Sequence, residues 1–140
     1  MNGTHHSGMN VICAEDCGNA PKKLLLRDYI VAWAQNNIEF IEKCISEEVC
    51  WDIIGDRRVL GKAGLRDTLQ QKQTGHVTEI EISTIITHGS MGAINGTFRM
   101  DQGRISNFCH VFTFSSAGKN GKIKKIMTYM IEDEDGHIDR

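Results

Sequence analysis

The hydrophobic pattern of the chain changes period near His76, and this change restricts the possible folds more than any other feature. Before it, apolar residues recur every three or four positions, as in Leu26, Ile30 and Trp33, which is typical of amphipathic helices. After it, apolar and polar residues alternate, which indicates half-exposed β-strands. Because helices precede consecutive strands joined by short turns, we predict an α+β fold with an antiparallel meander.

Helices are predicted in the first half of the chain. The first is expected to begin near Pro21, because Asn19 is a candidate N-cap and Pro21 falls in the first turn. It is expected to end at Ala34. A second, shorter helix with Ile45 on its inner side is expected after the Asn36-Asn37 break. A strand is predicted from about Val49 to Gly55, and a third helix is predicted over residues 62–72.

Long strands are predicted in the second half, over residues 77–86, 91–100, 104–114 and 123–131. Gly92 and Gly96 interrupt the second of these strands, which indicates bulges or strong curvature. Such curvature would let the sheet curl around the helices. A curled sheet covered by helices encloses a conical cavity, which is a suitable place for a small molecule.

The length and charge of the chain limit its organisation and its partners. A chain of 140 residues is expected to form one domain. We predict a flexible leader over residues 1–18, a single α+β domain over 19–133 and a frayed acidic tail over 134–140. The 16 basic and 18 acidic residues provide no basic field for a nucleic acid or a membrane surface. No apolar run approaches the ~20 residues of a membrane span.

The cysteines indicate a compartment rather than a site. The chain has five cysteines and no recognisable secretory signal. An odd number of cysteines fits reduced thiols in the cytoplasm better than a disulfide framework. The spacing of His5, His6, Cys13 and Cys17 matches no tetrahedral zinc pattern. We therefore expect a cytoplasmic protein with no metal and no cofactor.

Asp52 is the first candidate functional residue. It lies between Trp51 and Ile53 in a short apolar strand, so its side chain is expected to enter an apolar environment. Burying a carboxylate there without a partner costs several kcal/mol or raises its pKa, and a raised pKa suits a general base. The alternative is an aspartate at the strand edge that is solvated or paired with Arg57 or Arg58.

His110 is the second candidate, because strand alternation places it on one face with neighbouring phenylalanines. If that face lines a cavity, the imidazole can act as an acid–base group or as a hydrogen-bond donor. The alternative is a core histidine whose hydrogen bonds are satisfied. The aromatic residues on its face are Phe108, Phe112 and Phe114, and the matching set on the last strand is Ile126, Thr128 and Met130.

The chain resembles the nuclear transport factor two-like superfamily, which includes SnoaL-like polyketide cyclases, ketosteroid isomerases and scytalone dehydratases. The resemblance covers about residues 20–133. It implies a cystatin-like cone, in which a curved, mostly antiparallel sheet wraps around the N-terminal helices. The matching features are the helix Leu24–Ala34, the Asn36-Asn37 break, the segments Trp51–Gly55 and Gly61–Leu65, and the paired Phe112 and Phe114 before Gly118-Lys119.

The resemblance also implies roles for individual residues. Asp52 falls where the ketosteroid isomerases keep their proton-shuttling aspartate. Tyr29 falls near the tyrosine that donates a hydrogen bond to the substrate oxygen, and His110 replaces the second donor. The ligand pocket is expected to be lined by Trp33, Phe108, Phe112, Ile126, Thr128 and Met130.

Three functions are compatible with this sequence. The first is an isomerase, dehydratase or cyclase for a carbonyl compound, with Asp52 as base and Tyr29 or His110 stabilising the oxyanion. The second is a pocket that binds a small apolar or carbonyl-bearing ligand without turnover, and the third is a dimerising adaptor. Fold alone does not separate them. We also expect a homodimer through the outer face of the sheet, with Ile85, Met91 and Val111 as candidate contacts.

Overall fold

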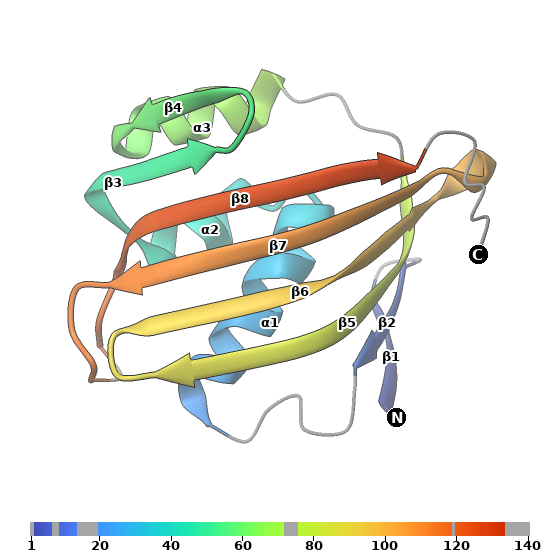
Figure 1. The fold of residues 1–140 in the computed structure, drawn as a ribbon, viewed down its shortest axis with the longest axis horizontal. Coiled ribbons are helices and arrows are strands. Elements are labelled where there is room, and N and C mark those ends of the chain that lie inside the picture. Colours follow the sequence, from blue (N-terminus) through green and yellow to red (C-terminus); the bar gives the residue numbers. More distant parts are fainter. Residues whose placement is uncertain (1, 7–8, 14–19, 72–75, 119, 134–140) are drawn as a thin grey trace.

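A computed structural model describes residues 2–6, 9–13, 20–71, 76–118 and 120–133, with only the backbone described for residues 2–6. Within these ranges, helices pack against one face of a single curved sheet (Figure 1). The elements in chain order are β1 (Asn2–His6), β2 (Met9–Cys13), α1 (Pro21–Ala34), α2 (Ile38–Cys44), β3 (Ile45–Ile53), β4 (Arg57–Leu60), α3 (Gly61–Gln71), β5 (Val77–His88), β6 (Met91–Met100), a 3₁₀ turn (Asp101–Gly103), β7 (Ile105–Phe114) and β8 (Ile123–Asp133).

The eight described strands follow the order β1-β2-β5-β6-β7-β8-β3-β4. Strands β5 to β8 form a continuous antiparallel meander. The parallel contacts in the described part are β2 with β5 and β3 with β8. The predicted α+β fold, with a curved and mostly antiparallel sheet around N-terminal helices, is therefore confirmed. None of the described helices combines the length and the apolar character needed to cross a membrane.

The hydrophobic core lies between α1 and the inner face of the sheet, which is the face that carries Phe98, Phe112 and Ile126. These three residues are fully buried. Trp33 of α1 stacks on Phe98 with ring centroids 5.3 Å apart and nearly parallel planes. Tyr29, one turn earlier, meets the edge of Phe112 at 5.1 Å. Burying each such ring stabilises the fold by ~1.5–3 kcal/mol, so the aromatic contacts fix α1 on the sheet.

Gly96 lies where β5 and β6 approach most closely. The pairing of β5 with β6 shifts register between Ile82 and Thr84, opposite this glycine. A Cβ atom at position 96 would lie 2.1 Å from the backbone oxygen of Glu81 and 3.0 Å from the ring of Phe108. The strand can therefore pass here only without a side chain, and the predicted irregularity at Gly96 is confirmed.

The same irregularity reverses the alternation along β5. Ile80 and Ile82 are buried, but beyond the register shift the buried residue is Ile85, and Ile86 is 58 % exposed. An uninterrupted period of two would place Ile82 and Ile86 on one face. The prediction that Ile85 points outward is therefore wrong, because the bulge inserts an extra residue.

The prediction of a flexible leader is wrong for two segments. β1 pairs with β2, and β2 runs parallel to β5, with Val11 opposite Ile80. Met9, Val11 and Cys13 are buried, and their alternation is the sequence signal of a strand. The other leader positions and the predicted acidic tail, residues 134–140, lie outside the described residues.

Two further predictions need correction. Cys13 is disulfide-bonded, so the prediction that the cysteines are reduced is wrong for this residue. Cys44, Cys50 and Cys109 carry free thiols. The second helix ends at Cys44 rather than including Ile45, because Ile45 has extended backbone angles and pairs with Ile123 in the sheet.

Candidate functional site

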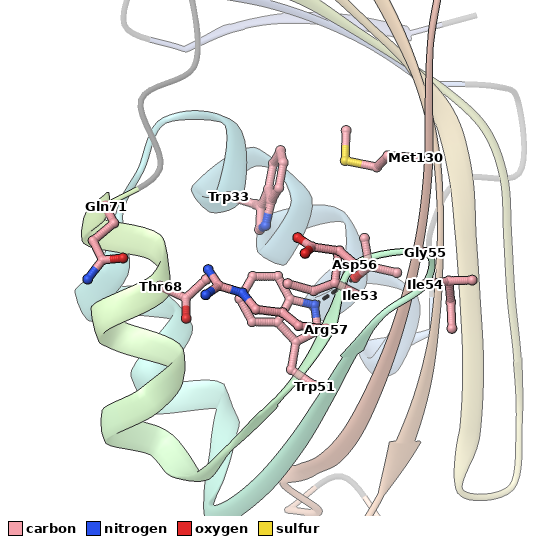
Figure 2. A pocket seen from close by; sticks show the side chains of 11 residues that line it. Trp33, Trp51, Ile53, Ile54, Gly55, Asp56, Arg57, Thr68, Gln71 and Met130 are labelled. Atoms are coloured by element: carbon pink, nitrogen blue, oxygen red, sulfur yellow. Dashed lines mark hydrogen bonds between the residues drawn. The ribbon is translucent and has the colours of Figure 1, made fainter.

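A cavity of about 450 Å³ lies between α1, α3, β8 and the hairpin formed by β3 and β4. Indole rings from α1 and β3 form much of its apolar wall, while the hairpin turn and one side of α3 surround its mouth (Figure 2). The lining residues are Trp33, Trp51, Ile53, Ile54, Gly55, Asp56, Arg57, Thr68, Gln71, Thr128 and Met130.

Strand alternation decides which hairpin side chains reach this cavity. Trp51 pairs with Val59, and Ile53 pairs with Arg57, so these residues lie on the inner face of the hairpin. Asp52 pairs with Arg58, which places both on the outer face. Val59 is buried beneath α3 and Trp51 is 3 % exposed. The adjacent arginines 57 and 58 therefore point to opposite faces of the hairpin.

Asp52 is an ion-paired residue of the outer face. Its carboxylate accepts hydrogen bonds from Arg58, at 2.6 Å from Nε and 3.4 Å from Nη2. The hydrogen bond from Arg58 holds the pKa of Asp52 below its usual value, with Lys125 contributing in the same direction. The prediction of a raised pKa is therefore wrong, because the apolar residues on either side of Asp52 turn to the other face.

The pair of Asp52 and Arg58 should make stability depend on pH in the acid range. Because the pKa of Asp52 is lower in the folded chain than the ordinary value of 3.8, its stabilising contribution is complete above that value. It is lost as the pH falls through the folded-state pKa. Thermal unfolding from pH 7 into the acid range should show the wild type more stable than Asp52→Asn at neutral pH, with a gap that closes below 3.8. A gap that is constant with pH would contradict this assignment.

Thr128 connects the cavity to His110. The Trp51 Nε1–H donates a hydrogen bond to Thr128 Oγ1 at 2.8 Å, and His110 Nδ1 lies 2.8 Å from the same oxygen. All three side chains are buried, and His110 is 0 % exposed. In the neutral imidazole with the proton on Nε2, the Thr128 hydroxyl donates to Nδ1. With the proton on Nδ1, the hydroxyl accepts from both rings and keeps its own hydrogen for a ligand in the cavity.

His110 itself lies behind the cavity wall. Its ring is surrounded by the rings of Tyr29, Trp33, Phe108 and Phe112, with centroids 5.7–6.2 Å away. Thr128, not His110, contributes to the lining. The structure therefore agrees with the alternative that His110 is a core residue. Its one connection to the cavity is through the hydroxyl group of Thr128.

The remaining predicted residues divide between the core and the cavity. Trp33, Thr128 and Met130, which the resemblance suggested for a ligand pocket, line the cavity. Tyr29 is 1 % exposed in the core, where burial, and secondarily Cys44, raises the pKa of its phenol. Tyr29 and His110 are thus close neighbours, but Asp52 lies on the opposite face of the sheet from both. The other predicted lining residues, Phe108, Phe112 and Ile126, are buried in the core.

The polar residues at the mouth of the cavity were not predicted from the sequence. Asp56 comes from the hairpin turn, Arg57 comes from the start of β4, and Thr68 and Gln71 come from α3. The turn is closed by a hydrogen bond from Asp56 N to Ile53 O, with Gly55 at a φ of 84°, a value that favours glycine. The alternation of Val49, Trp51 and Ile53 was the available signal, because it turns Arg57 inward and Asp52 outward.

No family model matches the sequence, and no curated protein matches it either. Solved structures with a similar fold do exist. A putative ketosteroid isomerase from Kribbella flavida has a TM-score of 0.66 at 12 % identity, covering 81 % of this chain and 79 % of that one. A putative SnoaL-like polyketide cyclase from Shewanella denitrificans has a TM-score of 0.65 at 14 % identity, covering 81 % and 92 %.

A third similar structure is SalBIII, described as an epoxide hydrolase/cyclase-like enzyme in pyran ring formation in the polyether salinomycin. Its TM-score is 0.63 at 20 % identity, covering 79 % of this chain and 90 % of that one. At these identities the likeness establishes the fold and leaves the reaction open. The chain therefore has the NTF2-like fold, which it shares with proteins described as cyclases, isomerases and epoxide hydrolases.

Proposed function

We propose that this chain binds a small, largely apolar molecule with a hydrogen-bonding oxygen in the cavity between α1, α3 and the β3–β4 hairpin. The observation that carries the proposal is the cavity itself, which has a volume of about 450 Å³ and is walled by Trp33, Trp51 and Met130. Small-molecule sites commonly have volumes of roughly 300–1,000 Å³, with mostly apolar walls and a few polar groups. Thr128 is such a polar group, and its hydroxyl suits a carbonyl or hydroxyl oxygen.

Binding is better supported than acid–base catalysis with Asp52 as the base. A general base must come within hydrogen-bonding reach of the proton it removes. Asp52 lies on the outer face of the hairpin and is held by Arg58, whereas the cavity opens on the inner face. Asp52→Asn should therefore leave ligand binding unchanged, whereas loss of turnover of a carbonyl compound in this variant, with binding retained, would show a reaction that uses Asp52.

Ligand binding can be measured with the intrinsic fluorescence of the chain. Both tryptophans of the sequence, Trp33 and Trp51, line the cavity, so a bound molecule should change the emission directly. Aromatic ketones and aldehydes that bind in the cavity should also raise the melting temperature of the protein. A ligand at 100 times its dissociation constant stabilises the folded state by ~2.7 kcal/mol.

A variant with a filled cavity provides the control for this screen. Met130→Trp places a larger ring in the wall and should abolish the fluorescence response and the thermal shift together. Leu60→Trp is the matched variant, because Leu60 is 68 % exposed and is not among the lining residues. Equal responses in both variants would show that the compounds bind elsewhere and would contradict the proposal.

The same proposal includes a homodimer formed through the outer face of the sheet. Large apolar side chains are exposed there, among them Ile86 (58 %), Tyr129 (40 %) and Ile131 (68 %). A stable interface commonly buries more than ~1,000 Å². Sedimentation velocity should give a dimer, and Ile86→Lys should give a monomer. Leu60→Lys, at the far edge strand, should leave the dimer intact. A monomeric wild type at tens of micromolar would refute this assembly.

A further inference from the structure

We infer that the ligand of this cavity carries a single carboxylate, which is bound by Arg57 at the mouth while an aromatic body lies against the indole rings inside. This inference rests on the proposed function and adds a charge to its ligand. Arg57 lies on the inner face through its pairing with Ile53. Figure 2 shows its guanidinium extending from the hairpin toward the side of the cavity formed by α3.

Arg57 differs from the other arginines in its lack of an internal partner. Among the described residues, every other arginine forms an ion pair with an aspartate or glutamate, whereas Arg57 takes part in no such ion pair. A guanidinium has five N–H donors in a planar fork, and its geometry matches a carboxylate through two parallel hydrogen bonds. The paired arginines are Arg27, Arg58, Arg66, Arg99 and Arg104.

The position of Arg57 fits a ligand that is apolar at one end and charged at the other. Trp33 and Trp51 lie inside the cavity, and Arg57 lies at the exposed mouth, on the same hairpin as Trp51. A flat aromatic body can therefore remain among the indoles while its carboxylate reaches the guanidinium. The charged end keeps partial contact with water, so binding does not require full burial of the carboxylate.

Asp56 limits the charge that the mouth accepts. It adjoins Arg57 in the turn and also lines the cavity. Within the described part of the chain no ion pair includes its carboxylate. Two like charges at about 4 Å repel by ~1 kcal/mol in water and by more near a protein surface. One guanidinium beside one carboxylate therefore favours a monoanion over a dianion such as a phosphate monoester.

The test compares three ligands that share a naphthalene ring and differ in their polar group, namely 2-naphthoate, 2-naphthamide and 2-naphthylmethyl phosphate, by isothermal titration calorimetry of the full chain. The wild type should bind the carboxylate at least about tenfold more tightly than the amide, because a hydrogen bond to a charged group contributes ~1.5–3 kcal/mol. The phosphate should bind more weakly than the carboxylate.

Adjacent arginines provide a matched pair of variants. Arg57→Gln should remove the preference for the carboxylate and leave the affinity for the amide nearly unchanged. Arg58→Gln removes the same charge one residue away on the outer face, where Arg58 is held by Asp52, and should keep the preference. Arg57→Lys should keep part of it, because the charge remains and the planar fork is lost. Asp56→Asn should tighten binding of both anions.

The outcomes separate this inference from the proposed function. Equal affinity of the wild type for amide and carboxylate would overturn the role of Arg57 while leaving the cavity as a binding site. Equal loss of preference in Arg57→Gln and Arg58→Gln would also overturn it, since a general charge effect would then be sufficient. Binding of none of the three ligands would count against both the cavity and the carboxylate.

Discussion

Gly96→Ala should destabilise the fold by at least ~3 kcal/mol, because among the described glycines a Cβ at position 96 makes the shortest contact. The new Cβ would lie 2.1 Å from the backbone oxygen of Glu81 and 3.0 Å from the Cα of Ile82. Both are backbone atoms of the paired strand β5, so no side-chain rotation relieves the overlap. Overpacking of this kind typically costs 1–3 kcal/mol, and more when the backbone has to move.

The measurement is urea unfolding followed by tryptophan fluorescence, with Gly118→Ala as the matched control. A Cβ at position 118 has its nearest contact at 3.8 Å, from the side chain of Ser116. That variant should change the free energy of unfolding by no more than ~0.5 kcal/mol. If Gly96→Ala is as stable as Gly118→Ala, the close approach of β5 and β6 is not a feature of the molecule.

Thr128→Val should lower the free energy of unfolding by about 2–6 kcal/mol, although the two side chains have nearly the same shape. The substitution removes the acceptor of Trp51 Nε1 and the hydroxyl partner of His110 Nδ1. Each buried polar group that loses its partner costs ~1–3 kcal/mol. The loss should exceed that of most surface substitutions, because Thr128 is 2 % exposed.

Thr128→Ser serves as the control, since it keeps the hydroxyl group and deletes one methyl group at a cost of ~0.8 kcal/mol. The nuclear magnetic resonance signal of the Trp51 indole N–H gives a second readout. It should shift strongly in Thr128→Val and stay close to its wild-type position in Thr128→Ser. Equal stability of the two variants would mean that the hydroxyl group holds neither ring in place.

The helices α1 and α3 and the β5–β8 meander could be predicted because each of these elements has a regular period over ten residues or more. The reversal of the buried and exposed positions along β5 could not be predicted, because a bulge is a property of two paired strands. The register shift opposite Gly96 becomes visible only when β5 and β6 are paired. The sequence indicated an irregularity at Gly96, but it did not indicate which isoleucine of β5 would become exposed.

The candidate site was predicted in part for a related reason. Thr128 and Met130 were expected at the cavity because the resemblance turns one face of the last strand inward, and Trp33 was expected there because it lies on the apolar side of the first helix. Asp52 was misplaced because its neighbours in sequence are apolar, whereas the alternation of the strand turns its side chain to the other face, opposite Arg58. Arg57 begins β4, and its inward direction follows from its pairing with Ile53, a register that becomes visible only once β3 and β4 are paired.

The pairing of β2 with β5 also covers an edge of the β5–β8 meander that could otherwise pair with other chains. Without β2, the long strand β5 would present a row of unpaired backbone N–H and C=O groups beside side chains rich in isoleucine. Such an exposed edge is a template for pairing with other chains. Shortening the chain to its helical start near Pro21 would therefore remove the cover from this edge and favour aggregation. β2 therefore completes the sheet and also covers an edge on which other chains could pair.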